Sequence, residues 1–357
     1  MHPGLRGSRT ISVPRLLQVE AGALDGLSAA LGTHFDPSRV VLATGAGISR
    51  VLGERLQADL RACDLSVELF SGLEGSLREV ARVLDRLDES PVSLVVAVGG
   101  GQPIDVAKLA AFRAGVDLVV VPTILSHDGM ASPVASLTGS DGFRRSIGAG
   151  MPAGVVIDVD VVQAAPDRYV RAGIGDLASN LTAVEDWRLA HASTGEDFDE
   201  FAASIALLSA KAATEVSWPL EADDVAAVAR GLVLSGLAME VAGSSRPCSG
   251  AEHLVSHALD RVRGAGAALH GEHVAIGVLI TSVLQEHPDR ERVRRLFDRI
   301  GLTAALRDLD VDESTLVEAV QLAPSTRPGR RTVLDGVDLS TPAVAAVVAT
   351  ALQGDGP

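Results

Sequence analysis

The sequence has very little cysteine and almost no lysine. Its two cysteines, Cys63 and Cys248, are too few for a disulfide framework, and this usage fits a reducing compartment. Only two of the 31 basic residues are lysines, Lys108 and Lys211, so arginine supplies nearly all of the positive charge. A lysine kept against such a bias is of functional interest, and Lys108 lies within the strongest motif of the chain.

Neither the start of the sequence nor its late apolar stretch is typical of a leader or a membrane span. Residues 1–17 contain no apolar core of signal-peptide length. The longest late apolar stretch, residues 343–352, is too short to span a bilayer, which takes about 20 residues. We therefore expect a soluble, cytoplasmic protein with no membrane partner.

Basic residues are fewer than acidic ones, 31 against 46, so the formal net charge is −15. An acidic surface repels the phosphates of nucleic acids, so a nucleic-acid partner is not expected. A small anionic substrate remains compatible, since a local basic pocket or a metal ion outweighs distant charges.

What is present is enough apolar sequence for two domains: 357 residues, 47% of them hydrophobic. The first part alternates predicted strands with predicted helices, which indicates a parallel sheet covered on both faces. After residue 168 the strand signal nearly vanishes and long helical stretches follow. We predict an α/β nucleotide-binding domain over residues 1–165 and an all-helical metal- and substrate-binding domain over residues 166–357. The predicted strands are 40–43, 66–70, 94–98, 118–121 and 155–157; the predicted helices are 49–63, 76–87, 103–114, 176–192, 198–216, 223–242, 251–263, 272–285 and 290–300.

A glycine-rich turn follows the predicted strand 94–98. The run Gly99-Gly100-Gly101-Gln102-Pro103 opens a helix, whose free N–H groups and positive dipole end suit a pyrophosphate. A tight strand-to-helix turn without a ligand is the alternative. A second glycine turn, at residues 44–49, also follows a strand and favours the nucleotide interpretation. The pattern is not the G-x-G-x-x-G fingerprint of ordinary dinucleotide-binding folds.

Aspartate and histidine gather in three polar segments of the second half. Asp176 lies near the start of a predicted helix, His253 and His257 are one helical turn apart, and His270 begins another helix. An aspartate and two histidines from separate helices form the mixed ligand set of a catalytic zinc. The alternative is that Asp176 caps a helix and the histidines are ordinary core or surface residues. His273 and the remaining histidines are expected at the surface.

Taken together, these motifs resemble the iron-containing alcohol dehydrogenase and dehydroquinate synthase-like superfamily, and within it the sn-glycerol-1-phosphate dehydrogenase family. The most specific stretch is VPTILSHDGMASP at residues 121–133. GDLASNLTAVEDWRLA at 175–190, SRPCSGAEH at 245–253 and His270-Gly-Glu also fit. The similarity spans most of the chain and implies a dehydroquinate synthase-like fold.

The resemblance also implies a role for each matching residue. Asp176, His253 and His270 would bind one zinc ion or another divalent metal. Asp128 and His257 would be catalytic and contact the substrate, which Asp176 also approaches; from the residues alone, Arg246 is a candidate for gripping a substrate phosphate. The cofactor would be NAD or NADP, since residues 70–72 carry neither an acidic residue nor an arginine to discriminate between them. Its expected contacts are Gly99, Gly100, Gly101, Gln102, Asp105, Lys108, Thr123, Ser126 and Ser132.

The implied reaction is the NAD(P)H-dependent reduction of dihydroxyacetone phosphate, or a related phosphorylated ketol, to sn-glycerol 1-phosphate, by a homo-oligomer. One alternative is a sugar-phosphate cyclase like dehydroquinate synthase, which recycles NAD within each turnover. Such enzymes usually have Glu where this chain has Asp176, and they line the substrate pocket with lysines. The other alternative is a non-catalytic nucleotide-binding protein, which would be expected to have lost metal ligands.

Overall fold

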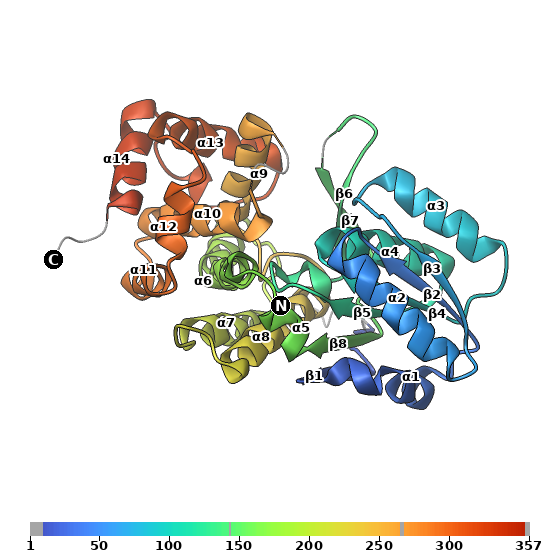
Figure 1. Ribbon diagram of the computed structural model, residues 1–357. Helices are drawn as coiled ribbons and strands as arrows, with labels where there is room; N and C mark the ends of the chain where they lie inside the picture. Colours follow the sequence, from blue (N-terminus) through green and yellow to red (C-terminus); the bar gives the residue numbers. More distant parts are fainter. Residues whose placement is uncertain (1–9, 143, 265–267, 354–357) are drawn as a thin grey trace.

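The structure is a computed structural model that describes residues 10–142, 144–264 and 268–353. The first half of the chain forms a sheet with helices on both faces, and the second half forms a group of helices beside it (Figure 1). The predicted combination of an α/β part with a parallel sheet and a helical part is confirmed.

The main sheet has six strands, all parallel, in the order β1-β8-β5-β4-β2-β3. Five of these strands match the predicted ones, whereas β1 was not predicted; it pairs with β8, more than 100 residues later in the chain. The strands are β1 (Leu16–Glu20), β2 (Arg39–Thr44), β3 (Ser66–Phe70), β4 (Leu94–Gly99), β5 (Asp117–Pro122) and β8 (Gly154–Asp158).

Both faces of this sheet are buried, so its strands are apolar without alternation. In β4, Leu94, Val96 and Val98 pack with α1 (Leu27–Phe35) and α2 (Ile48–Arg61). Val95 and Ala97 point the other way and join the core that contains α3 (Leu77–Asp88) and α4 (Gly101–Ala114). The sheet therefore separates α1 and α2 from α3 and α4.

That separation creates a crevice at one edge of the sheet. β2 and β4 are neighbours, but the chain leaves β2 toward β3 and leaves β4 toward β5. The helices that follow them, α2 and α4, consequently lie on opposite faces of the sheet. In open α/β sheets, ligands bind outside the carboxyl ends of the strands at such a topological switch point.

A small antiparallel hairpin, which was not predicted, lies between the two halves. Its strands are β6 (Val134–Thr138) and β7 (Arg144–Gly148). In β6, Ala135 and Leu137 are buried against the core that includes α4, while the intervening side chains are more exposed. The hairpin projects toward the helical half and forms one wall of the cavity described below.

After α5 (Val159–Gln163), the described part of the second half is helical throughout. α6 begins at Asp167, nine residues earlier than predicted, because Pro166 precedes its first turn. α13 extends through Thr326, so the basic segment 327–331 follows it directly. The helices are α6 (Asp167–Thr194), α7 (Glu200–Thr214), α8 (Ala222–Ala242), α9 (Ala251–Arg263), α10 (His270–Leu284), α11 (Arg290–Arg299), α12 (Leu302–Arg307), α13 (Glu313–Thr326) and α14 (Thr341–Leu352).

Among the described residues, one helix, α8, is long and apolar enough to cross a membrane. Its apolar window is 67% buried inside the protein, where it packs against α7 and α6. Helices buried in the core of a protein share this composition, so the membrane signal is weak. α8 also contacts β1, so the two halves of the chain touch. The division of the chain into two domains at residue 165 stays a prediction.

Candidate active site

Three side chains from separate helices of the second half meet at one point. Asp176 comes from the interior of α6, His253 from the first turn of α9, and His270 from the first residue of α10. Their ligand atoms all lie within 4.8 Å of one another, with Asp176 Oδ1 at 3.7 Å from His253 Nε2 and 3.8 Å from His270 Nε2. Asp176 is not a helix cap, since α6 starts nine residues before it.

These separations fit a shared divalent cation. They are too long for direct hydrogen bonds, yet ligands about 2.0–2.2 Å from a tetrahedral ion lie a little over 3 Å from one another. Burial, followed by the charge of Asp128, raises the pKa of Asp176 to about 8. Burial also lowers the pKa of His270 well below its usual value. A cation at this point would stabilise the carboxylate and use the neutral imidazole as a ligand.

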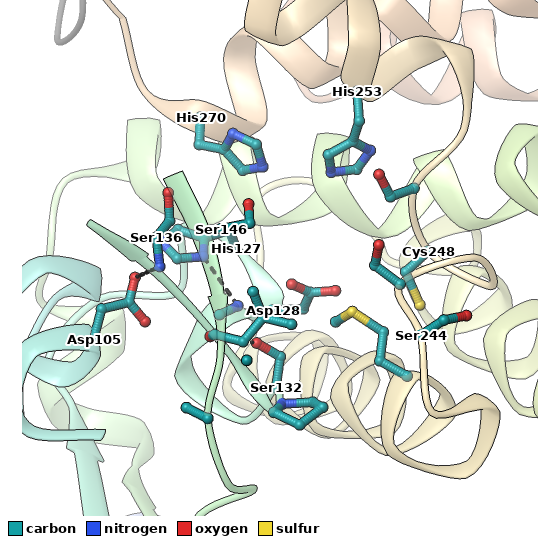
Figure 2. Close-up of a pocket in the computed structure, with 18 of the residues that line it drawn as sticks. Asp105, His127, Asp128, Ser132, Ser136, Ser146, Ser244, Cys248, His253 and His270 are labelled. Atoms are coloured by element: carbon teal, nitrogen blue, oxygen red, sulfur yellow. Dashed lines mark hydrogen bonds between the residues drawn. The ribbon is translucent and has the colours of Figure 1, made fainter. Parts of the chain in front are cut away.

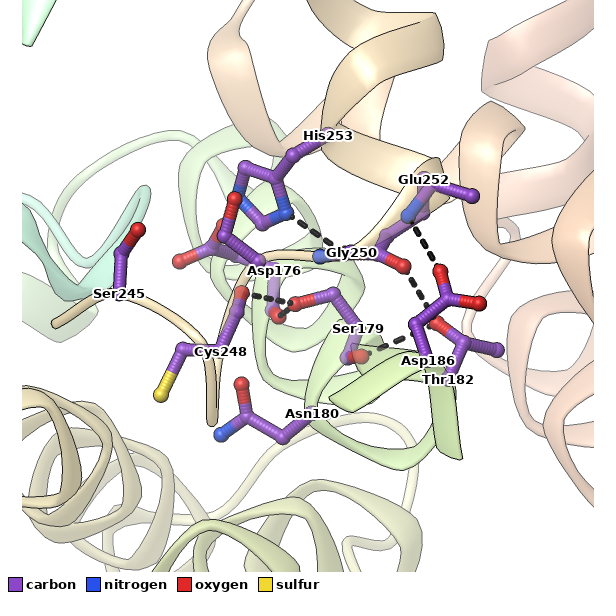
Figure 3. A network of polar contacts seen from close by, with 12 residues as sticks. Asp176, Ser179, Asn180, Thr182, Asp186, Ser245, Cys248, Gly250, Glu252 and His253 are labelled. Atoms are coloured by element: carbon purple, nitrogen blue, oxygen red, sulfur yellow. Dashed lines mark hydrogen bonds and ion pairs between the residues drawn. The ribbon is translucent and has the colours of Figure 1, made fainter. Parts of the chain in front are cut away.

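A buried carboxylate behind His253 orients its ring (Figure 3). Glu252 Oε1 lies 3.0 Å from His253 Nδ1, which leaves His253 Nε2 facing Asp176. Glu252 is itself held by the hydroxyl of Thr182 at 2.9 Å and by the backbone N–H of Gly250. Histidine ligands of metals usually carry such a partner on their second nitrogen. Glu252 was not among the predicted site residues, although its position directly before a candidate ligand was a signal for it.

The histidines open into a cavity of about 450 Å³ between the two halves of the chain. Figure 2 shows His253 and His270 projecting into it, opposite Asp128 and Ser132. The cavity brings together six of the predicted site residues, which are Asp105, Asp128, Ser132, His253, His257 and His270. The predicted catalytic residues and two of the three predicted metal ligands, His253 and His270, therefore border one space.

Asp128, from the first half of the chain, is fixed in this cavity by two helices of the second half. Its backbone N–H donates to Asp176 Oδ2 at 2.8 Å, and its Oδ2 accepts from the hydroxyl of Ser235 on α8 at 2.7 Å. Ser235 in turn accepts from Asn180 Nδ2 at 3.1 Å. The carboxylate is thus held beside the Asp176–His253–His270 cluster, where it can accept a proton or a hydrogen bond from a bound molecule.

The glycine turn lies at the carboxyl end of β4, next to the switch point. Gly99 has φ 148°, and Gly100 is the N-cap of α4 without any side-chain cap. Gly47 has φ 60° and caps α2 in the same way. Both helices therefore present unpaired backbone N–H groups at adjacent strand ends, which fits the pyrophosphate of a dinucleotide. Gln102 is exposed there, and buried Thr123 and Ser126 follow β5 next to it.

The Lys108 side chain forms hydrogen bonds with buried groups of the protein itself. The buried ammonium donates to Asp105 Oδ1 at 3.0 Å, to Val134 O at 2.8 Å and to Gly129 O. All three of its donors are used, so the geometry does not favour a contact with the cofactor. Asp105 also accepts from Ser136 N at 3.0 Å and borders the cavity. Lys108 and Asp105 together connect α4 to the loop that carries Asp128 and to the hairpin β6–β7.

The chain is similar in sequence to a family of dehydrogenases. The family described as iron-containing alcohol dehydrogenase matches residues 18–166. The glycerol-1-phosphate dehydrogenase of Hyperthermus butylicus is 39% identical over 91% of this chain and 93% of its own length. That of Cenarchaeum symbiosum is 36% identical over 95% of this chain and 96% of its own length. The chain belongs to the glycerol-1-phosphate dehydrogenase family. As a member of this family, it is an NAD(P)-dependent dehydrogenase.

Solved structures agree with this assignment. A probable glycerol dehydrogenase from Sinorhizobium meliloti has a TM-score of 0.76 and 26% identity over 96% of this chain and 98% of its own. The glycerol dehydrogenase of Schizosaccharomyces pombe also reaches a TM-score of 0.76, at 19% identity over 96% of this chain and 90% of its own, and shows a common fold.

Arg246 is not brought to the cavity of this dehydrogenase. Its buried guanidinium donates from Nε to Glu196 Oε1 at 2.6 Å and from Nη1 to Arg331 O at 2.8 Å. Arg246 is therefore engaged in an ion pair with Glu196 and is not free to bind a substrate phosphate in the cavity. The arginines that do line the cavity are Arg144, on β7, and Arg327, directly after α13. Arg327 was not among the predicted site residues.

The expectation that the remaining histidines lie at the surface is wrong for three of them. His127 lines the cavity, with Nδ1 accepting from Gly129 N at 3.0 Å. His273 is fully buried one turn after His270, and its Nδ1 lies 2.9 Å from Asp260 Oδ1. His287 is buried as well. The Nδ1 atom of His273 has its partner on another helix, whereas those of His127 and His287 accept from backbone N–H groups two residues later. Helical spacing alone does not reveal such partners.

Proposed function

We propose that this dehydrogenase reduces dihydroxyacetone phosphate to sn-glycerol 1-phosphate with NADH or NADPH, using zinc or another divalent metal held by Asp176, His253 and His270. The observation that carries the proposal is the Asp176–His253–His270 cluster opening into a cavity that Asp128 and His257 also line. Curated relatives named glycerol-1-phosphate dehydrogenase match the chain over nearly its whole length, which supports the choice of substrate.

The dinucleotide would lie in the crevice at the switch point. The backbone of Gly99, Gly100, Gly101 and Gln102 would hold the pyrophosphate at the start of α4. Asp105, Thr123, Ser126 and Ser132 would contact the cofactor from α4 and from the loop after β5. Ser132 and Asp105 border the cavity, so the end of the cofactor that carries out the chemistry would reach it there.

When bound, a divalent cation supplies Lewis-acid stabilisation of the negative charge that develops on a carbonyl oxygen during reduction. Asp128, fixed by Ser235, would accept a hydrogen bond from a substrate hydroxyl. Burial and the neighbouring His253 lower the pKa of His257 to about 4, so this imidazole is neutral at pH 7. It lies one helical turn from His253, where it can relay a proton to the product alcohol.

The other expected properties remain parts of this proposal. We infer a cytoplasmic, homo-oligomeric enzyme whose partners are its phosphorylated ketol or polyol substrate and its cofactor, with no nucleic acid or membrane. The net charge of −15 supports the absence of a nucleic-acid partner. The exposed apolar side chains of Phe201 and Leu208 on α7 support contact with another copy of the chain.

The test is the oxidation of NADH and of NADPH by zinc-loaded protein with dihydroxyacetone phosphate, with dihydroxyacetone alongside. We expect fast, stoichiometric oxidation with the phosphate ester and formation of the sn-1 product. Asp128→Ala should depress turnover strongly while dinucleotide binding persists. A substrate-dependent reaction that consumes no net cofactor would instead indicate a cyclase, and the absence of any oxidation would overturn the substrate assignment.

A further inference from the structure

We propose that Arg327, held by Ser245 and backed by Arg330, binds the phosphate group of the substrate at the end of the cavity. This inference rests on the proposed function and adds the residues that would select a phosphorylated over an unphosphorylated ketol. It moves the phosphate grip from Arg246, which is engaged elsewhere, to two arginines of the segment after α13.

The two guanidinium groups converge on one hydroxyl. Arg327 Nη1 and Arg330 Nη2 each donate to Ser245 Oγ at 3.0 Å, and Arg330 Nη1 also donates to Ser249 O. A serine hydroxyl has two acceptor lone pairs and one proton. Both lone pairs of Ser245 are taken, and no described residue accepts its proton. Since Ser245 lines the cavity, its O–H can donate to an oxygen atom of a ligand there.

Positive charge accumulates at this point without a matching carboxylate. Within the described ranges, Arg246 is paired with Glu196, whereas neither Arg327 nor Arg330 forms an ion pair. Burial, and then the charges of Arg327 and Arg246, lower the pKa of Arg330 to about 9. Burial likewise lowers the pKa of Arg327, with Arg246 as the next cause. Glu196 and Glu252 also act on Arg330, but only as smaller causes, so an incoming anion would stabilise these neighbouring cations.

The position of Arg327 suits the far end of a small substrate. His257 lines the cavity together with Arg327, and its ring centroid lies 6.5 Å from that of His253 and 6.3 Å from that of His270. A three-carbon ester could then place its carbonyl at the cluster and its phosphate at Arg327. Arg144, from the opposite wall, also lines the cavity and forms no ion pair within the described residues. A planar guanidinium fork matches a phosphate dianion in two-point geometry better than an ammonium does.

Arg327→Gln is the direct test, because this side chain makes one hydrogen bond in the described structure. We expect kcat/KM for dihydroxyacetone phosphate to fall about 10- to 100-fold, the range typical of a lost charged hydrogen bond. The value for dihydroxyacetone should be unchanged. Arg261→Gln is the matched control: it removes the same charge nearby, and Arg261 lines the adjoining cavity but not the one that Ser245 and the histidines of the cluster border. Arg327→Lys keeps the charge without the planar guanidinium group. Its kcat/KM for dihydroxyacetone phosphate should lie between those of Arg327→Gln and the unmodified protein.

Inorganic phosphate separates this inference from the proposed function. In the zinc- and NAD-loaded protein, calorimetry should show phosphate binding that weakens at least 10-fold in Arg327→Gln and not in Arg261→Gln. If the protein fails to reduce dihydroxyacetone phosphate but this pattern holds, the anion site stands and the substrate assignment fails. If it reduces the ester and Arg327→Gln matches Arg261→Gln in kinetics and phosphate binding, the anion site is refuted and the reaction stands.

Discussion

At the scale of single residues, a carboxylate next to a histidine fixes the orientation of its ring. Two carboxylates on α9, Glu252 and Asp260, each lie about one hydrogen bond from the Nδ1 of a histidine. Glu252 supports His253, which belongs to the proposed metal site, whereas Asp260 supports His273, which does not. The two pairs have similar lengths, 3.0 and 2.9 Å, so they form a natural comparison.

We predict that Glu252→Gln weakens zinc binding about 10- to 100-fold, because the ring of His253 loses the charge that fixes its orientation and raises its basicity. Competition with a chromogenic chelator measures the affinity. Asp260→Asn should leave zinc affinity unchanged, since it alters an equivalent histidine outside the site. Equal effects of the two substitutions would mean that Glu252 acts only through the general stability of α9.

At the scale of elements, the start of α4 is shaped by the loop that follows β5. A Cβ atom added to Gly101 would fall against the ring of His127, well inside van der Waals distance. That ring cannot move freely, because its Nδ1 accepts from Gly129 N. The glycine therefore allows the first turn of α4 and the Asp128 loop to approach each other where the dinucleotide is proposed to bind.

Gly101→Ala should weaken NAD(P)H binding by about tenfold, which corresponds to a cost of about 1.4 kcal/mol. Cofactor fluorescence provides the measurement. The double variant Gly101→Ala/His127→Ala removes the obstructing ring and should recover part of the affinity. Gly32→Ala, an exposed site on α1 with nothing near its Cβ, should bind normally and be slightly more stable. Unchanged binding in Gly101→Ala would argue against a pyrophosphate at this helix terminus.

At the scale of the whole molecule, the proposed metal joins parts of the chain that are far apart in sequence. The cluster draws on α6, α9 and α10, and Asp176 also accepts from the Asp128 backbone in the first half. Binding that favours the folded state stabilises it by mass action, about 2.7 kcal/mol when free zinc is 100 times its Kd. We therefore expect zinc to raise the thermal unfolding midpoint of the protein and not that of His253→Ala.

This stabilisation should depend on pH through Asp176. Its pKa of about 8 in the metal-free protein means that a proton occupies the carboxyl at neutral pH and must leave when zinc binds. Zinc stabilisation should grow from pH 6 to 8 with release of about one proton. Metal-free protein should change in the opposite sense and lose stability as pH rises from about 4 through 8, since the unfolded carboxyl releases its proton near 3.9. Zinc stabilisation that is the same at pH 6 and pH 8 would contradict this assignment.

The sequence by itself determined the features that depend on local pattern. Apolar runs such as residues 94–98, followed by glycines and a helix, are readable because both strand and turn are set within a dozen residues. The same holds for α9, where His253 and His257 are four residues apart on one helix. The resemblance added which of these histidines to assign to the metal, an assignment that stays a proposal.

Only the tertiary structure decided how distant side chains pair. β1 exists because Leu16–Glu20 finds an edge at β8, and the hairpin β6–β7 forms against α4. Arg246 turns away to Glu196, while Arg327 reaches the cavity, although both are arginines beside a proline. Nothing local distinguishes them. The partner of a charged side chain is set by packing between elements, which brings together residues that no short stretch of sequence contains.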